Sequence, residues 1–255
     1  SKGVSLPHYP WQRTFHWTET KALKNFRLGK APHPLSGVKQ FSAIPSWEKD
    51  LDGHTRTVLQ DHVINTRPIF PAAGYIETFL DIAAQTVTTK SYSLSDISFD
   101  ALLALPKDDS LYVRTTLNDN QLTLFARTYR GDGDWKAYAS AKLLQREKTI
   151  DAVDITKYIS PFEGKKLRRT EIYRGLDNAG LSYGPAFQVI DYAVCSEGFV
   201  QAQLSLPKDA PILSYAHVQP SIMDGALQLL ALSSPNNSQT ALPVSIAQFS
   251  LFSKE

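Results

Sequence analysis

Apolar residues recur at helical spacing in two segments of this chain, residues 71–85 and residues 220–232. The recurring positions are Ala73, Ile76, Leu80 and Ala83 in the first segment and Met223, Leu227 and Leu230 in the second. This spacing places the side chains on one face, so each segment is predicted to be a helix with one buried stripe. Both segments open at a proline, Pro71 and Pro220, which suits a first helical position because its missing N–H needs no partner there.

Strand patterns fill most of the remaining chain. Residues 111–117 and 121–129 flank Asn118-Asp119-Asn120, and this arrangement predicts a hairpin. Further strands are predicted at residues 135–144, 191–195, 199–206 and 244–252, and a short helix at residues 171–179. Residues 1–45 are rich in proline and predict an extended lead-in with short strands. The polar residues 145–165 predict a linker.

The order of elements is similar in the two halves of the chain. Each half has one proline-started helix beside several antiparallel strands, although the halves share little residue-level similarity. A helix wrapped by a curved antiparallel sheet, present twice, is a double hotdog, which is an α+β fold. We therefore expect an N-terminal hotdog with its lead-in linker over residues 1–150, and a linker with the C-terminal hotdog over residues 151–255.

Composition narrows the class of protein further. The 255 residues carry a net charge of +2, so charge balance gives no sign of nucleic-acid binding. The dense basic run at residues 165–169 is interpreted as a solvated loop or as a contact for an acidic partner protein. The single cysteine, Cys195, excludes a disulfide framework and a CxxC metal site. Without a signal-peptide pattern or a membrane-spanning stretch, the expected location is the cytoplasm.

His62 differs from the other five histidines in its surroundings. Apolar residues lie around it, and the first predicted helix begins shortly afterwards at Pro71. Burial disfavours the charged imidazolium and keeps the ring neutral, as a general base requires. A structural histidine is the other interpretation that these residues allow.

Asp224 lies on the second predicted helix among apolar neighbours. One interpretation is a carboxylate that interacts with the helix dipole. The other is a carboxylic acid whose pKa is raised by desolvation, so that it can donate a proton near neutral pH. Gln228 follows four residues later on the same helix face, where it could position the acid or a substrate hydroxyl.

A glycine-proline turn supplies further candidates. Residues 180–188 predict a rigid turn in which Gly184 brings backbone N–H groups close to a ligand and Tyr183 supplies a hydroxyl. Free N–H groups are also expected at the helix start after Pro71, around Gly74. Either set could bind the oxygen of a thioester as it becomes enolate-like. The sequence has no GxGxxG, P-loop, GxSxG or zinc-type spacing.

Three of these segments resemble motifs of the dehydratase domains of polyketide synthases. The family pattern HxxxGxxxxP matches at His62 and Pro71, and DxxxQ matches at Asp224 and Gln228. The GYxYGPxFQ-like pattern matches residues 180–188 almost in full. Family-like flanks are His33-Pro-Leu35, the LP-containing residues 241–246 and a linker at residues 6–17. The motifs occur in the family's order, and the resemblance covers nearly the whole chain.

Two positions depart from the family pattern. Thr66 stands where the motif has glycine, and a β-branched residue resists positive φ. We therefore expect the loop after His62 to turn differently or to narrow the substrate tunnel between the two halves. Gln219 replaces a histidine that is often found five positions before the aspartate. Pro71 and Asp224 are retained, and the loss of either would have suggested a relative that shifts double bonds or only closes rings.

The resemblance implies a 3-hydroxyacyl-[acyl carrier protein] dehydratase, a hydro-lyase of polyketide biosynthesis in secondary metabolism. It implies one pocket between the two hotdogs, with His62 and Asp224 as the catalytic pair. The implied substrate-binding residues are Gln228, Tyr183, Gly184, Gly74, Pro71 and Phe187. No metal or other cofactor is implied for the domain itself, because the substrate arrives on the phosphopantetheine of an acyl carrier protein.

The resemblance implies two other partners, namely neighbouring polyketide synthase domains and a second copy of the chain. It implies neither nucleic acid nor membrane.

Two alternative functions stay open at this point. The first is a bifunctional dehydratase and cyclase that forms an oxygen heterocycle by oxa-Michael addition. The second is a catalytically silent module that docks the carrier protein or has a structural role.

Overall fold

Two long helices, α3 (Ala72–Thr86) and α5 (Pro220–Ser233), pack against each other, and both begin where the sequence predicts. The computed structural model describes residues 33–51, 53–88, 91–107, 109–128, 134–146, 154, 163–196, 198–213, 217–233 and 242–251. Pro71 caps the first helix in an extended conformation, as its fixed φ allows. The predicted apolar stripe of α3 is confirmed, since all four of its residues are fully buried. The predicted stripe of α5 is buried only in part, because Met223 is buried, Leu227 is half-buried and Leu230 is 58% exposed, so the prediction is wrong at Leu230.

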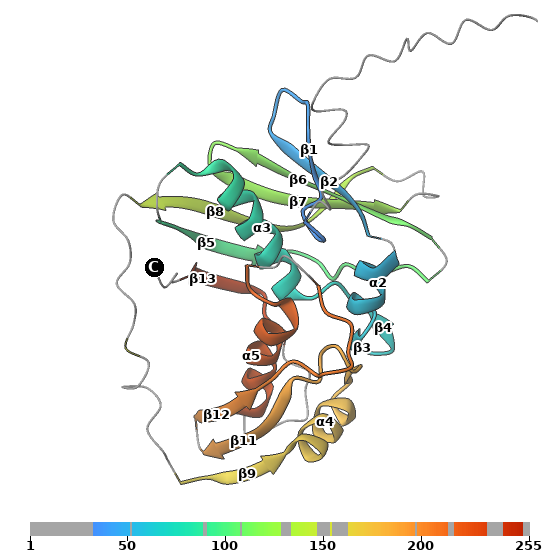
Figure 1. Ribbon diagram of the computed structural model, residues 1–255, viewed down its shortest axis with the longest axis vertical. Helices are drawn as coiled ribbons and strands as arrows, with labels where there is room; N and C mark the ends of the chain where they lie inside the picture. Colours follow the sequence, from blue (N-terminus) through green and yellow to red (C-terminus); the bar gives the residue numbers. More distant parts are fainter. Residues whose placement is uncertain are drawn as a thin grey trace, which may run out of the picture. The chain divides into compact units, whose positions relative to one another are not determined.

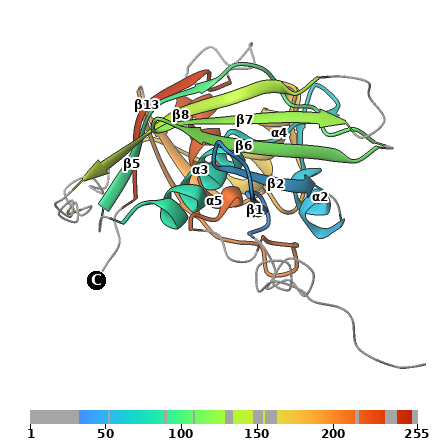
Figure 2. The same cartoon turned by 90° about the horizontal axis from the view of Figure 1, so that it is seen from above.

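A seven-stranded antiparallel sheet packs against α3 (Figures 1 and 2). Its strands, in spatial order, are β1 (Val38–Gln40), β2 (Ser46–Leu51), β6 (Leu111–Asn118), β7 (Gln121–Thr128), β8 (Lys136–Arg146), β5 (Ser91–Phe99) and β13 (Ser245–Ser250). The predicted hairpin is confirmed, but its turn is shorter than expected because Asn118 pairs with Gln121. The two turn residues, Asp119 and Asn120, both have positive φ, which matches the twist of the flanking strands.

The last strand, β13, pairs with β5, so the second half of the chain contributes the edge strand of the large sheet. The predicted domain boundary at residue 150 lies outside the described residues, as do residues 1–32 of the predicted lead-in. Of that lead-in, the described part contains the short strand β1.

A second, three-stranded sheet packs with α4 (Arg169–Asn178) and α5 (Figure 1). Its strands are β12 (Phe199–Leu204), β11 (Ile190–Ser196) and β9 (Lys165–Arg168). The basic run at residues 165–169 therefore forms an edge strand and the start of α4, and its interpretation as a loop is wrong. The strand forms because β9 pairs with β11 over four residues, and Lys166 Nζ lies 4.7 Å from the centre of the Tyr192 ring.

The third sheet is small and joins the two halves. It contains β10 (Leu181–Tyr183), β3 (His62–Ile64) and β4 (Arg67–Pro68), and a short helix, α2 (Gly53–Leu59), precedes β3. The pairing of β10 with β3 places Tyr183 directly opposite His62. No helix among the described residues has the length and apolar character needed to cross a membrane.

Candidate active site

His62 and Asp224 meet in one buried pocket, with 3.6 Å between Nε2 of the histidine and Oδ1 of the aspartate. His62 comes from strand β3 in the first half of the chain, and Asp224 comes from helix α5 in the second half. Their exposed fractions are only 6% and 4%. The sequence prediction that the two side chains share one site is therefore confirmed.

The hydrogen bonds of His62 fix which ring nitrogen faces the aspartate. Nδ1 lies 2.9 Å from the carbonyl oxygen of Ile69, which can only accept, so Nδ1 carries the proton. In a neutral ring Nε2 then has a free lone pair, and this is the nitrogen that faces Asp224. The rings of Tyr183 and Phe187 pack edge-on against the imidazole, each at a centroid distance of 5.5 Å.

Asp224 is a buried carboxyl group that accepts a hydrogen bond from a side chain of its own helix. Burial raises its pKa, while the nearby His62 and the hydrogen bond from Gln228 act in the opposite direction. Gln228 Nε2 donates to Asp224 Oδ2 at 2.9 Å, as their four-residue spacing on α5 predicts. Relative to an exposed aspartate, burial thus shifts this carboxyl toward its protonated form.

Tyr173 on α4 belongs to this site, although the sequence did not single it out. Its hydroxyl lies 3.3 Å from Gln228 Oε1 and accepts a hydrogen bond from the Ile190 N–H at 2.9 Å. Burial raises the pKa of Tyr173 to about 12, so the hydroxyl keeps its proton at neutral pH. The Phe187 carbonyl is a second acceptor for this hydroxyl at 3.3 Å and also accepts from Gln228 Nε2 at 3.1 Å, so Tyr173 and Phe187 together surround the amide that donates to Asp224.

The turn after His62 corrects one expectation. Asn65 and Thr66 have φ values of 46° and 69°, and they connect β3 to β4 as a two-residue turn with positive φ at both positions. Thr66 therefore does adopt a positive φ, so the reason given for a different turn, that a β-branched residue would avoid this conformation, is wrong. Thr66 is also exposed and does not line the pocket, so it does not narrow it.

Gly74 and Gly184 do not present free N–H groups, which corrects their predicted role in binding a thioester oxygen. The Gly74 N–H donates to the Pro71 carbonyl, and the Gly184 N–H donates to the Asp61 carbonyl. Both glycines instead permit close packing. A Cβ on Gly74 would lie 2.7 Å from the Phe70 ring, and one on Gly184 would lie 2.4 Å from the Asp61 side chain.

The pocket around the pair encloses about 630 Å³ of empty space, which includes open solvent at its mouth. Gln228 and Tyr183 line it as predicted, whereas Gly184, Gly74, Pro71 and Phe187 do not. Apolar lining residues that the sequence did not reveal include Phe99, Ala101, Leu102, Leu227, Ala231 and Leu242. Ala72, at the N-terminus of α3, also lines the pocket.

Metal binding by the site would depend on the described side chains that can act as ligands. Among the residues that the structure describes, no three histidine, cysteine, aspartate or glutamate side chains are grouped so that they could hold a metal ion. The chemistry that the pocket itself offers is proton transfer between a nitrogen base and a carboxylic acid inside an apolar cavity.

A helix packed on an antiparallel sheet in each half, with an acid and a base meeting between the halves, defines the double-hotdog acid–base enzymes. Two family models match this chain: "Polyketide synthase dehydratase domain" over residues 33–130 and "Polyketide synthase dehydratase N-terminal domain" over residues 151–255. The chain belongs to the polyketide synthase dehydratase family. Both the predicted fold and the predicted class, a hydro-lyase acting on 3-hydroxyacyl thioesters, are thereby confirmed.

Similar proteins include very large synthases. The highly reducing polyketide synthase lcsB of Purpureocillium lilacinum is 26% identical over 245 residues, covering 90% of this chain and 10% of that protein. The low-reducing polyketide synthase drtA of Aspergillus calidoustus is 27% identical over 251 residues, covering 88% of this chain and 11% of that protein. The chain therefore spans about a tenth of the length of these curated relatives.

Solved structures agree on the fold. The dehydratase domain of the polyketide synthase PpsC from Mycobacterium tuberculosis matches with a TM-score of 0.66 and 26% identity, covering 85% of this chain and 80% of that one. The dehydratase domain from the CurK module of the curacin polyketide synthase matches with a TM-score of 0.75 and 24% identity, covering 87% and 83%. The second likeness shows the fold alone.

Proposed function

We propose that this domain removes water from a 3-hydroxyacyl thioester carried by an acyl carrier protein, with His62 as the base and Asp224 as the acid. The observation that supports this most directly is the 3.6 Å separation of His62 Nε2 and Asp224 Oδ1 inside a buried pocket. Elimination requires proton removal at one carbon and proton donation to a hydroxyl on the next. An acid and a base a few ångströms apart can reach both positions of one acyl group.

The proposed step moves two protons and breaks one carbon–oxygen bond. His62 Nε2 takes the proton from the α-carbon, and its lone pair is free to do so because the ring proton lies on Nδ1. Asp224 gives its proton to the β-hydroxyl, which leaves as water, and the electrons of the broken C–H bond form the alkene. The product is an α,β-enoyl thioester, and a later proton transfer from His62 to Asp224 restores the starting state.

The polar lining of the pocket suggests how the substrate is held. Helix α3 leaves its first backbone N–H groups without intrahelical acceptors, and Ala72 at this end lines the pocket. The backbone N–H of Ala72, rather than that of Gly74 or Gly184, is the proposed donor to the thioester carbonyl. Tyr183 and Gln228 would orient the β-hydroxyl, and the apolar wall would contact the acyl chain.

The carrier and the neighbouring domains follow from the family. The matched relatives are synthases about ten times longer than the matched segment, so we propose that this domain acts beside other synthase domains in the cytoplasm. The substrate would arrive on a phosphopantetheine arm, and the domain would need no cofactor of its own. A homodimer is proposed on the same family basis.

The two alternative functions lack a specific observation in their favour. The cyclising reaction rests on Thr66, and that side chain lies outside the pocket. A silent docking module would have no need for a buried acid and base at 3.6 Å. Dehydration is therefore the function that the site supports best.

The test uses the whole chain and a pantetheine-linked 3-hydroxyacyl substrate, with the enoyl product detected by mass spectrometry. We expect turnover by the unaltered protein, no product with His62→Ala, and a loss of at least about 100-fold with folded Asp224→Asn, since general acid–base catalysis contributes about 10²–10⁴-fold. His54→Ala is the matched control, because His54 is exposed and lies on α2 outside the pocket. Normal turnover by His62→Ala would remove His62 from the mechanism.

A further inference from the structure

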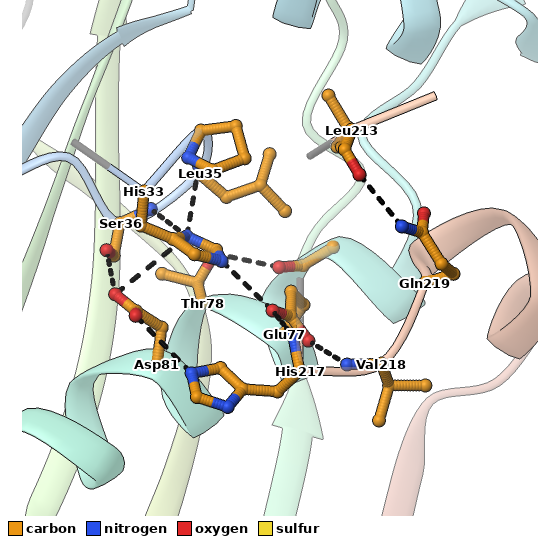
Figure 3. A network of polar contacts seen from close by, with 12 residues as sticks. His33, Leu35, Ser36, Glu77, Thr78, Asp81, Leu213, His217, Val218 and Gln219 are labelled. Atoms are coloured by element: carbon orange, nitrogen blue, oxygen red, sulfur yellow. Dashed lines mark hydrogen bonds and ion pairs between the residues drawn. The ribbon is translucent and has the colours of Figure 1, made fainter. Parts of the chain in front are cut away.

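A second cluster of polar side chains gathers around Glu77 and Asp81 of α3 (Figure 3). None of its residues lines the catalytic pocket. At its centre is Glu77, which has no exposed surface. Its carboxylate accepts three hydrogen bonds: from His33 Nε2 at 3.0 Å, from the His217 backbone N–H at 2.6 Å and from the Val218 backbone N–H at 2.8 Å. A buried carboxylate requires such partners, and here two of the three are backbone groups from 140 residues further along the chain.

The direction of the His33 contact follows from its other nitrogen. The backbone N–H groups of Leu35 and Ser36 both donate to His33 Nδ1 at 3.3 Å, so Nδ1 is the acceptor. Nε2 therefore carries the proton and donates it to Glu77. Glu77 accepts in all three contacts, which is the pattern of an ionised carboxylate.

The two backbone groups bound by Glu77 lie immediately before α5. Val218 precedes the first residue of that helix by two positions and precedes Asp224 by six. Gln219 Nε2 donates to the Leu213 carbonyl at 2.9 Å, which closes the segment on its other side (Figure 3). Any displacement of the Glu77 contacts is therefore passed along a rigid helix to Asp224.

The same helix α3 is connected at its other end to His62. The helix begins after Pro71, and the preceding Ile69 exchanges two hydrogen bonds with His62, through the backbone and through Nδ1. Helix α3 is thus linked to the base through the segment before its N-terminus, and through Glu77 to the backbone that precedes the helix of the acid.

From this geometry we infer that Glu77 is a positioning residue for the dehydration reaction, which holds the start of α5 so that Asp224 stays within reach of the substrate opposite His62. This inference rests on the proposed function. Glu77 itself touches no reacting atom. Its effect on rate comes from distance, because a misplacement of about 1 Å in an active site can cost about 100-fold.

Asp81 offers a matched comparison, since it lies one helical turn further along α3 in the same cluster. Its carboxylate contacts the side chains of Ser36, Gln85, His217 and His33, with 3.5 Å from Oδ1 to His217 Nε2 and 3.8 Å from Oδ2 to His33 Nδ1. These contacts involve side chains, whereas those of Glu77 hold the backbone before α5. Neutralising Asp81 therefore disturbs the side chains of His33 and His217 without altering the carboxylate that accepts from the backbone N–H groups of His217 and Val218.

The experiment compares Glu77→Gln with Asp81→Asn in the full chain, with circular dichroism confirming that each is folded at the assay temperature. Glutamine keeps the shape but turns an –NH₂ group toward one of the N–H donors, so one backbone contact is lost. For Glu77→Gln we expect kcat to fall about 10- to 100-fold with KM changed less than about threefold. Asp81→Asn should keep kcat within about threefold.

Equal kcat for the two variants, or an unchanged kcat for folded Glu77→Gln, would overturn the inference while leaving the proposed function intact. Inactivity of the unaltered chain would instead refute the proposed function. If Glu77→Gln does not fold, Glu77→Asp is measured by the same criterion. Aspartate keeps the charge, but its side chain is one methylene shorter, so the carboxylate lies further from the backbone N–H groups. Failure of both to fold beside a folded Asp81→Asn would make Glu77 a folding determinant and overturn the assignment.

Discussion

Replacing Thr66 with glycine should stabilise the protein, because Thr66 has a backbone conformation that its side chain opposes. Its φ of 69° lies in the left-handed region, where a residue with a Cβ is disfavoured by about 1–2 kcal/mol. Glycine removes that penalty but makes the unfolded chain more flexible, which lowers the gain in the free energy of unfolding by about 0.5–1 kcal/mol. The exposed hydrogen bond from Thr66 Oγ1 to the Asn65 carbonyl, at 2.5 Å, is also lost, and it contributes little at the surface.

The net gain in the free energy of unfolding is therefore about 0–1.5 kcal/mol, with a central value of about 0.75 kcal/mol. For a chain of this length each kcal/mol corresponds to about 2–4 °C, so the central value raises Tm by about 1.5–3 °C. Thermal unfolding followed by circular dichroism measures this shift, and urea unfolding measures the free energy directly. Turnover should stay within about twofold of the unaltered protein, because Thr66 does not line the pocket.

Asn120→Gly is the matched control, since Asn120 has φ of 66° at the second position of the turn between β6 and β7. Asparagine tolerates the left-handed region far better than a β-branched residue, so its replacement should change the free energy of unfolding less than Thr66→Gly does. A Thr66→Gly protein that is less stable than the unaltered chain, or one that gains no more than Asn120→Gly, would refute the reasoning.

Two further predictions concern the catalytic site. Burial raises the pKa of Asp224, so its contribution to stability is present at acid pH and is lost as pH rises through the folded-state pKa. In urea unfolding, the free energy of unfolding of Asp224→Asn should therefore equal that of the unaltered chain near pH 4 and exceed it at pH 8. A stability difference independent of pH would contradict this. Tyr173→Phe leaves the buried Ile190 N–H without its acceptor, which should cost about 1–3 kcal/mol. It should also lower kcat more than it changes KM, because the Gln228 amide loses the hydroxyl beside its Oε1. Unchanged stability and kcat together would remove Tyr173 from the site.

Much of this fold follows from local patterns in the sequence. The stripes of α3 and α5 specify helices because their apolar residues repeat at helical spacing over several turns, and the hairpin of β6 and β7 follows from its turn residues. His62 and Asp224 were recognisable for a related reason, since each is an ionisable group among apolar neighbours and lies in a motif.

Other features depend on partners far away in the chain, and no local pattern reveals them. Strands β3, β4 and β10 have two or three residues each, too few to show a period. Gly184 is required by the side chain of Asp61, and Tyr173 enters the site only through Gln228. Glu77 looks like an ordinary polar residue on a helix until residues 217–218 are placed against it.

The chemistry requires the correct protonation states of His62 and Asp224 and the correct distance between them, and different contacts determine the two. The proton of His62 is fixed by Ile69 within the first half, and the carboxyl of Asp224 is held by Gln228 within α5. The gap between them depends instead on contacts between the halves, namely β3 with β10 and Glu77 with the start of α5. A substitution in the first group alters which groups carry protons, whereas one in the second group alters their separation. The pH dependence of kcat and its absolute value therefore report on different parts of the same fold.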